Sequence, residues 1–227
     1  MRLPLLETER LLIREFAAQD LEAVHHLLDV ALAETDTGTE GALTLAARRR
    51  WLEWTVLNYE HLAYLRQPPY GDRAIVLRRT GELIGACGLV PCLAPFAQIP
   101  VMCASLDSAA AAAGSRASTA FDLGSGAAPG MGHALDPAAV QEPLARHSPE
   151  VGLYWAIAPT HQRQGYATEA ARALAGYAFA ALKVRRLVAT TGDDNIASIG
   201  VMRKLGMRLD RNPYAEPHWL QVVGVLD

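Results

Sequence analysis

The sequence contains no run of apolar residues long enough to cross a membrane, which takes roughly 18–20 residues. Residues 1–14 carry charges throughout and include no apolar segment of the kind found in secretory signals. We therefore expect a cytoplasmic protein with no membrane partner. With 227 residues, of which 51% are apolar and 20% charged, the chain suits a single soluble domain with a substantial core.

Cysteine is scarce, and the three present, Cys87, Cys92 and Cys103, stand at irregular spacing. They match neither a CxxC metal or redox motif nor a disulfide framework. The histidines are scattered, and the adjacent His25 and His26 cannot share a helix face. The sequence therefore predicts free thiols packed as small apolar side chains, and no metal site.

An overall excess of positive charge is also absent, since the formal net charge is −3. This argues against a nucleic-acid partner. Residues 161–208 nevertheless hold eight basic and three acidic residues, a local charge of +5 that leaves −8 for the rest of the chain. Two interpretations stay open: chance placement on solvated helix faces, or a local field that suits a small polyanion.

Apolar periodicity and turn signals predict alternating strands and helices. Strands are expected over residues 10–16, 73–78, 83–90, 150–157, 186–191, 207–210 and 219–226. Helices are expected over residues 21–29, with Asp20 as N-cap, and over 44–64, 166–182 and 197–205. The strand–helix–strand order of residues 150–191 favours a parallel, right-handed crossover.

Residues 94–148 differ in character, because they include Ala/Gly/Ser/Pro runs of low complexity. Such a segment has too few large apolar side chains to offset the entropy of ordering, so much of it is expected to be mobile. Both flanks resemble parts of one sheet. We therefore interpret residues 94–148 as an insertion within a single domain that covers residues 1–227.

The stretch from Pro159 to Thr168 joins a predicted strand to a predicted helix N-terminus. The first four N–H groups of a helix lack intrahelical partners, and together with the helix dipole they form an anion site. Gly165 lets the backbone approach a bulky ligand. The stretch lacks the Gly-Lys-Ser/Thr ending of a nucleotide P-loop, which argues against ATP or GTP chemistry.

In this strand–loop–helix context, the spacing of Gln162, Gly165 and Ala167 resembles the Arg/Gln-x-x-Gly-x-Gly/Ala loop of the GNAT superfamily of N-acetyltransferases. Three further stretches look like the branch that contains the ribosomal-protein alanine acetyltransferases. They are Glu7–Arg14 (ETERLLIR), Glu150–Trp155 (EVGLYW) and Asn195–Gly206 (NIASIGVMRKLG). The resemblance covers roughly residues 7–93 and 149–227.

This resemblance implies an α/β (α+β) fold with a mixed, mostly antiparallel sheet of six to seven strands. The sheet would be splayed at its centre, between its fourth and fifth strands, with helices on both faces. The residues implied to bind acetyl-CoA as co-substrate are Trp155, Ala156, Ile157, Gln162, Arg163, Gln164, Gly165, Tyr166, Ala167, Thr168, Asn195 and Lys204. Residues 155–157 would pair with pantetheine and residues 162–168 would hold the pyrophosphate. Asn195 would contact the coenzyme arm, whereas Lys204 would reach a phosphate or only cap its helix.

The activity implied is direct acetyl transfer from acetyl-CoA to a primary amine, either a protein N-terminus or a small-molecule amine. Many GNAT enzymes place a tyrosine acid seven residues after the asparagine, but here that position is Met202. Ser198 is carried over as a donor to the thiolate, and its alternative role is an exposed hydroxyl. Glu150 is the candidate base, and its alternative role is a solvated charge at a strand edge. A backbone N–H of residues 154–157 would stabilise the oxyanion.

The substrate and the assembly stay open. An α-amine is easier to use than a lysine-like amine, because neutralising it at pH 7 costs only about 1 kcal/mol. The acidic remainder of the chain favours a cationic acceptor. The alternative function is a non-catalytic acyl-CoA-binding module, in which Met202 marks a lost acid. The protein is expected to be a monomer or a homodimer.

Overall fold

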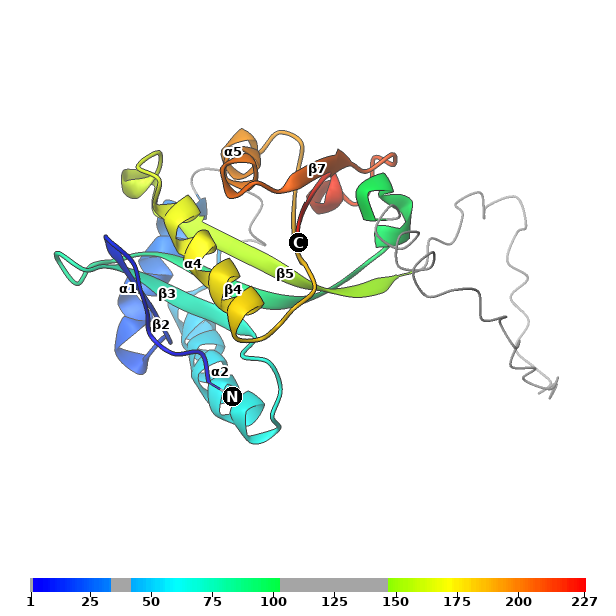
Figure 1. Ribbon diagram of the computed structural model, residues 1–227. Helices are drawn as coiled ribbons and strands as arrows, with labels where there is room; N and C mark the ends of the chain where they lie inside the picture. Colours follow the sequence, from blue (N-terminus) through cyan, green and yellow to red (C-terminus); the bar gives the residue numbers. More distant parts are fainter. Residues whose placement is uncertain (1, 34–41, 103–146) are drawn as a thin grey trace, which may run out of the picture.

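The computed structural model describes residues 2–33, 42–102 and 147–227. Within these residues eight strands form one open sheet, in the order β1-β2-β3-β4-β5-β6-β8-β7. Figure 1 labels β2 to β5 and β7 of this sheet. The strands are β1 (Leu6–Glu7), β2 (Leu11–Arg14), β3 (Gly71–Leu77), β4 (Leu83–Ala94), β5 (Ser148–Ile157), β6 (Leu187–Thr191), β7 (Arg208–Arg211) and β8 (Val222–Leu226). Neighbouring strands run antiparallel except β5 and β6, which are parallel. The predicted mixed, mostly antiparallel sheet is confirmed, and the two-residue β1 extends it beyond seven strands.

Helices cover both faces of this sheet (Figure 1). The α-helices are α1 (Leu21–His25), α2 (Leu45–Tyr64), α4 (Tyr166–Ala180) and α5 (Ile196–Leu205). A π-helical segment, η2 (His26–Ala31), continues α1, and the short 3-10 turns are η1 (Ala18–Asp20), η4 (Phe96–Gln98), η5 (Pro159–His161) and η6 (His218–Leu220). In the described residues α4 lies on one face of the central strands, while α1 and α2 lie against the other.

Asp20 occupies the N-cap position of the first helix, as predicted, but its side chain does not cap that helix. The Asp20 side chain makes no capping hydrogen bond to α1. Its carboxylate accepts hydrogen bonds from the Arg14 guanidinium, at 2.7 and 2.8 Å, and from the backbone N–H of Ala17. A charged partner on the neighbouring strand therefore outcompetes the helix end for this carboxylate.

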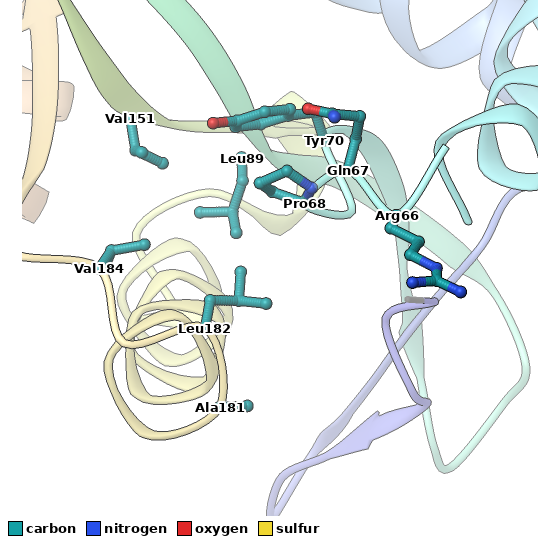
Figure 2. A pocket seen from close by; sticks show the side chains of 9 residues that line it. All are labelled: Arg66, Gln67, Pro68, Tyr70, Leu89, Val151, Ala181, Leu182 and Val184. Carbon is teal, nitrogen blue, oxygen red and sulfur yellow. The ribbon is translucent and has the colours of Figure 1, made fainter. Parts of the chain in front are cut away.

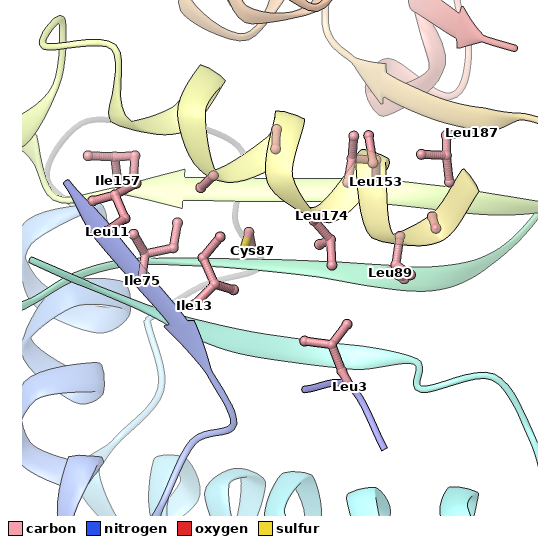
Figure 3. Close-up of a cluster of buried hydrophobic side chains, with 14 of the residues drawn as sticks. Leu3, Leu11, Ile13, Ile75, Cys87, Leu89, Leu153, Ile157, Leu174 and Leu187 are labelled. Atoms are coloured by element: carbon pink, nitrogen blue, oxygen red, sulfur yellow. The ribbon is translucent and has the colours of Figure 1, made fainter. Parts of the chain in front are cut away.

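Two hydrophobic clusters enclose the centre of the sheet. The cluster shown in Figure 3 lies between the sheet and α4, and it includes Ile75, Leu89, Leu153 and Leu174. A second cluster lies between the other face and the α1–α2 layer, where Tyr154 packs against it. Successive residues of β5 therefore point to opposite faces, as expected for a strand with both faces covered.

The first part of the predicted insertion is ordered. β4 continues to Ala94, and Phe96, Ile99 and Met102 are buried against β6 and β8. Burial of these apolar side chains stabilises this part of the segment. Residues 103–146, which contain those runs, lie outside the described residues, so the mobile insertion and the single-domain boundary stay predictions. Among the described helices none has the length and apolar character needed to cross a membrane.

Candidate functional site

The sheet opens into a gap between β5 and β6. The register of this parallel pair contains one bridge, Gly152↔Val188, although β5 continues to Ile157 and β6 to Thr191. On its other edge β5 stays paired with β4 along its whole length. The C-terminal half of β5 therefore presents a free edge to the gap, which is the splayed centre expected from the sequence.

The backbone of β5 offers polar groups to this gap. Ala158 N–H donates to Ile84 C=O at 2.8 Å, so this residue pairs with β4. Because the direction of backbone groups alternates along an antiparallel strand, Ala156 also directs its N–H and C=O toward β4. Those of Trp155 and Ile157 point toward the gap. Of the three residues predicted to pair with pantetheine, Trp155 and Ile157 thus face the gap and Ala156 does not.

The predicted phosphate loop lies directly after β5. Two of its residues have left-handed backbone conformations, Arg163 (φ 60°) and Gly165 (φ 84°), and Gly165 is the N-cap of α4. The N–H groups of Tyr166, Ala167 and Thr168 lie in the first helical turn and have no intrahelical partners. Within the described chain no other group bonds to them. This turn of the backbone concentrates N–H donors at the positive end of α4, as in an anion-binding nest.

Side chains hold this loop in place at both ends. Gln162 Nε2 donates to Ile157 C=O at 3.0 Å, which ties the loop to the gap-facing edge of β5. Gln164 Nε2 reaches Thr160 C=O at 3.3 Å. The Arg163 side chain is exposed and, among the described residues, has no ion-pair partner. It is therefore available to an anionic ligand.

Arg10, which precedes β2, supports the loop from outside, and its contribution was missed in the sequence. Its Nη1 donates to Gln164 C=O at 3.0 Å, and its Nη2 lies 2.6 Å from Glu169 Oε2 in the first turn of α4. The guanidinium also stacks over the Tyr166 ring, 4.5 Å from its centroid. Burial alone would raise the pKa of Glu169, but hydrogen bonds from Thr8 and Arg10 outweigh it and lower that pKa.

Asn195 begins α5 on the other side of the gap. Its Oδ1 accepts a hydrogen bond from Ser198 N–H at 3.0 Å, which makes Asn195 the N-cap of this helix. The Nδ2 group of Asn195 keeps its two donors. Ser198 is partly buried, and no described group bonds its hydroxyl. Met202, at the position where the resemblance implies a tyrosine acid, is buried against Ile199, Met207 and Val222, so it fills the core.

Lys204 lies in the last turn of α5 and is exposed. Its carbonyl accepts a hydrogen bond from Arg172 Nη2 of α4 at 2.9 Å, which links the two helices. Gly206 then ends α5 with a left-handed conformation (φ 84°). The Lys204 ammonium group at this position can stabilise the C-terminus of α5 or reach a phosphate, so both predicted roles stay open.

Glu150 lies on the closed side of the gap. Its carboxylate is paired with Arg186 through both oxygens, at 2.8 and 2.9 Å, and both side chains are largely buried. Seven residues of extended strand separate Glu150 from Ile157, a distance of about 23 Å. The predicted base therefore lies far from the end of β5 that leads into the predicted phosphate loop, and it must leave an ion pair before it can accept a proton.

A second carboxylate, which was missed in the sequence, lies nearer the gap. Asp72 of β3 pairs with Gly88 of β4, which pairs with Tyr154 of β5. Burial, the main cause, raises the pKa of Asp72 to about 6, although the nearby charges of Arg73 and Arg48 oppose the rise. No clear sequence signal marked it, because Asp72 directly precedes the predicted strand of residues 73–78 and lies next to Arg73.

A cavity of about 210 Å³ lies elsewhere, at the C-terminal end of α4 (Figure 2). Its wall combines Leu182 and Val184 with Tyr70 and Leu89, and Figure 2 shows these side chains around an open space. The phosphate loop is at the opposite end of α4. This cavity is therefore separate from the predicted coenzyme site.

Cysteine and metal predictions can be compared with the described residues. Cys87 and Cys92 are free thiols, and burial raises the pKa of Cys87 to about 12, so it is an unreactive part of the core. Cys103 lies outside the described residues. Within the described ranges no group of three His, Cys, Asp or Glu side chains is placed to hold a metal ion.

Part of the chain matches a known protein family. The acetyltransferase (GNAT) domain family matches residues 116–208. The uncharacterised N-acetyltransferase YnaD of Bacillus subtilis strain 168 is 44% identical over 62 residues, which cover 27% of this chain and 35% of YnaD. The chain thus spans about a third of the length of this curated relative.

Solved structures extend the likeness to the whole fold. An acetyltransferase from Agrobacterium tumefaciens strain C58 superimposes with a TM-score of 0.59 and 22% identity, over 100% of this chain and 96% of its own. RimL, a ribosomal L7/L12 alpha-N-protein acetyltransferase in complex with coenzyme A, gives a TM-score of 0.58 and 12% identity, over 98% and 97%. At these identities the likeness concerns the fold.

Proposed function

Because this chain carries a GNAT acetyltransferase domain, we propose that it transfers the acetyl group of acetyl-CoA to a primary amine, on a protein N-terminus or a small molecule. The observation that supports this most directly is the junction of β5 with α4. There the unpartnered N–H groups of residues 166–168 lie beside the gap-facing edge of β5. A phosphate-rich ligand with an amide-bearing arm matches both features.

Each part of acetyl-CoA has a counterpart in this arrangement. The pyrophosphate suits the loop of residues 162–168, where helix N–H groups and the exposed Arg163 supply donors and positive charge. The pantetheine amides suit the backbone groups of Trp155 and Ile157 that point toward the gap. The amide donors of Asn195, across the gap, suit a carbonyl of the arm.

The chemistry we propose is attack of a neutral amine on the thioester carbon. The oxyanion then needs a preorganised donor, and the gap-facing N–H of Trp155 is our candidate. The leaving thiolate needs a proton, for which the unbonded hydroxyl of Ser198 is the candidate donor. Met202 supplies none, because its thioether is buried and carries no proton.

Gly165→Asp tests the coenzyme loop. A carboxylate at this position repels phosphate, so we expect acetyl-CoA binding to be lost. Gly165→Ala is the matched control, because it adds the same backbone strain at φ 84° without charge, and its Cβ lies 3.4 Å from Arg10 Nη2. The measurement is thermal stabilisation by acetyl-CoA, which should reach about 2.7 kcal/mol at 100 times Kd in the wild type.

Release of free thiol in the presence of amines separates transfer from simple binding. Stabilisation by acetyl-CoA together with thiol release supports the proposal. Stabilisation without thiol release across a broad amine panel indicates the acyl-CoA-binding module instead. If Gly165→Asp binds acetyl-CoA as the wild type does, the loop does not hold the coenzyme.

A further inference from the structure

A row of three paired residues crosses the sheet face that α1 and α2 cover. Asp72, Gly88 and Tyr154 lie on β3, β4 and β5 and are direct neighbours in register. Directly paired residues point to the same side of a sheet, and Tyr154 packs toward the α1–α2 layer. The row lies two residues beyond Gly152, where β5 last pairs with β6. Asp72 and Tyr154 therefore share one face at the mouth of the gap.

Gly88 lets Asp72 approach Tyr154. A Cβ at this position would lie 2.6 Å from Gly71 C=O and 3.1 Å from the Asp72 Cα, which is closer than side chains tolerate. The start of β3 therefore leans over β4 on this face. The charge of Asp72 also contributes to the raised pKa of Tyr154, after burial, so the two groups interact electrostatically.

The Asp72 carboxylate has no hydrogen bond or ion pair in the described chain, and the residue is partly buried. The two neighbouring guanidinium groups are engaged elsewhere. Arg48 forms two 2.7 Å hydrogen bonds with Asp29, and Arg73 donates to the carbonyls of Pro69, Gly71 and Asp72. A carboxylate partly withdrawn from water is stabilised by a nearby positive charge. This one is therefore available to a cation from outside the chain.

We propose that Asp72 is the proton acceptor of the amine site, and that it draws the acceptor's ammonium group to this face of the gap. The proposal rests on the proposed acetyl transfer and names the base that this reaction needs. The distance from β3 to the free edge of β5 is about 10 Å, two inter-strand spacings. The proton therefore travels through water or the Tyr154 hydroxyl.

The steps balance without any further reactant. The ammonium nitrogen loses one proton to the Asp72 carboxylate, which later releases it to solvent. The nitrogen lone pair then forms a bond to the thioester carbon. The carbon–sulfur bond breaks with its electron pair on sulfur, and the second nitrogen proton ends on the thiolate.

The charged and titratable groups around Asp72 come from each element that packs against it. They are Arg48 and Tyr59 of α2, Arg73 of β3, Cys87 of β4 and Tyr154 of β5. Burial, the largest cause in each case, raises the pKa values of Tyr59 and Cys87 to about 12 and also raises the pKa of Tyr154. Asp72 is therefore the group of this set that changes charge near pH 6.

The test compares Asp72→Asn with wild type on two amines. Alanine amide is protonated at neutral pH and needs a base, whereas 2,2,2-trifluoroethylamine is already neutral and does not. We expect Asp72→Asn to lower kcat/KM for alanine amide by about tenfold at pH 7, because only about a tenth of an α-amine with a pKa of about 8 is neutral there. The loss with trifluoroethylamine should stay below about twofold, because this amine needs no proton removed before it attacks.

Two further readouts separate a base from a structural residue. In the wild type, kcat/KM for alanine amide should rise as the pH increases through about 6. In Asp72→Asn, kcat/KM should show no rise in this pH range. The KM for acetyl-CoA should not change. Glu53→Gln, an exposed carboxylate of α2, is the control and should match the wild type.

The outcomes are distinct. If Asp72→Asn slows both amines equally, or neither, while the wild type uses both, Asp72 is not the proton acceptor. If the wild type binds acetyl-CoA but acetylates no amine, the proposed transfer itself fails, and the assignment fails with it. A selective loss with alanine amide and a flat pH profile support the proposal.

Discussion

Asp72 and Glu150 are carboxylates on neighbouring parts of one sheet, but their surroundings give them opposite properties. Glu150 is held through both oxygens by Arg186. Asp72 has no such partner among the described residues, and burial raises its pKa to about 6. A protein that keeps an unpaired buried charge loses stability by doing so, which is typical of functional sites.

This difference predicts a pH-dependent gain of stability for Asp72→Asn. The folded-state pKa of Asp72, about 6, lies above its usual value of 3.8, so the folded protein binds the proton more tightly. The wild type therefore loses stability as pH rises from about 4 to 6, by about 3 kcal/mol in all. Asp72→Asn should be more stable than wild type by up to that amount at pH 8, and equal to it at pH 4.

Denaturant unfolding at pH 4, 6 and 8 measures this difference. A variant that is less stable at pH 8 would show that Asp72 has a stabilising partner. Glu53→Gln again serves as control and should show no pH-dependent difference, because its carboxylate is exposed.

At this scale the sequence predicted the geometry of the loop before α4 better than the surroundings of the carboxylates. The left-handed Gly165 at the start of α4 is a feature of local backbone geometry, so the spacing within one loop was sufficient to predict it. The state of Asp72 depends on Gly88 and Tyr154, which are near it only after strands pair. The Arg186 partner of Glu150 is likewise brought in by β6. No local pattern contains these contacts.

Among the elements, α5 begins at a residue with two roles. Asn195 caps the helix and is also a candidate contact for the coenzyme. Asn195 Oδ1 caps the helix through Ser198 N–H, while its Nδ2 donors stay available across the gap from β5. Aspartate caps a helix as well as asparagine does but has no N–H group. The two roles can therefore be separated by substitution.

We expect Asn195→Asp to keep the stability of the wild type and to raise the KM for acetyl-CoA several-fold. Asn195→Ala should raise this KM and also lower the free energy of unfolding by about 1 kcal/mol, the usual loss for an N-cap. Steady-state kinetics and denaturant unfolding of both variants provide the measurements. An unchanged KM in Asn195→Asp would leave Asn195 with the capping role alone.

The order of the elements was predictable because periodicity and turn residues mark strands and helices locally. The extent of β4 was not, since the sequence placed its end at residue 90 and the structure continues it to Ala94. Phe96 and Ile99 then find a core formed by β6 and β8, from the far end of the chain. These two side chains are ordered because they are buried in tertiary contacts, and the composition of the surrounding segment does not reveal such contacts.

For the molecule as a whole, the sheet consists of two parts that meet at one seam. Strands β1 to β5 form one part and β6 to β8 the other, and their shared bridge is Gly152↔Val188. The Glu150–Arg186 pair lies beside this bridge, with side chains 9% and 11% exposed. We infer that this pair holds the closed end of the gap, where the parts must stay together while the coenzyme end stays open.

Glu150→Ala should therefore act on stability. Removing one member of a buried ion pair leaves the other charge without its partner, and the typical loss is about 3–5 kcal/mol. Asp227→Ala is the control, because the Arg208–Asp227 pair is about half exposed and its loss should be below about 1 kcal/mol. In the Glu150→Ala/Arg186→Ala double variant the losses should not add, since both report the same contact. If Glu150→Ala instead keeps its unfolding free energy while acetyl transfer falls by 10² or more, the size of a lost general base, Glu150 is the base and Asp72 is not.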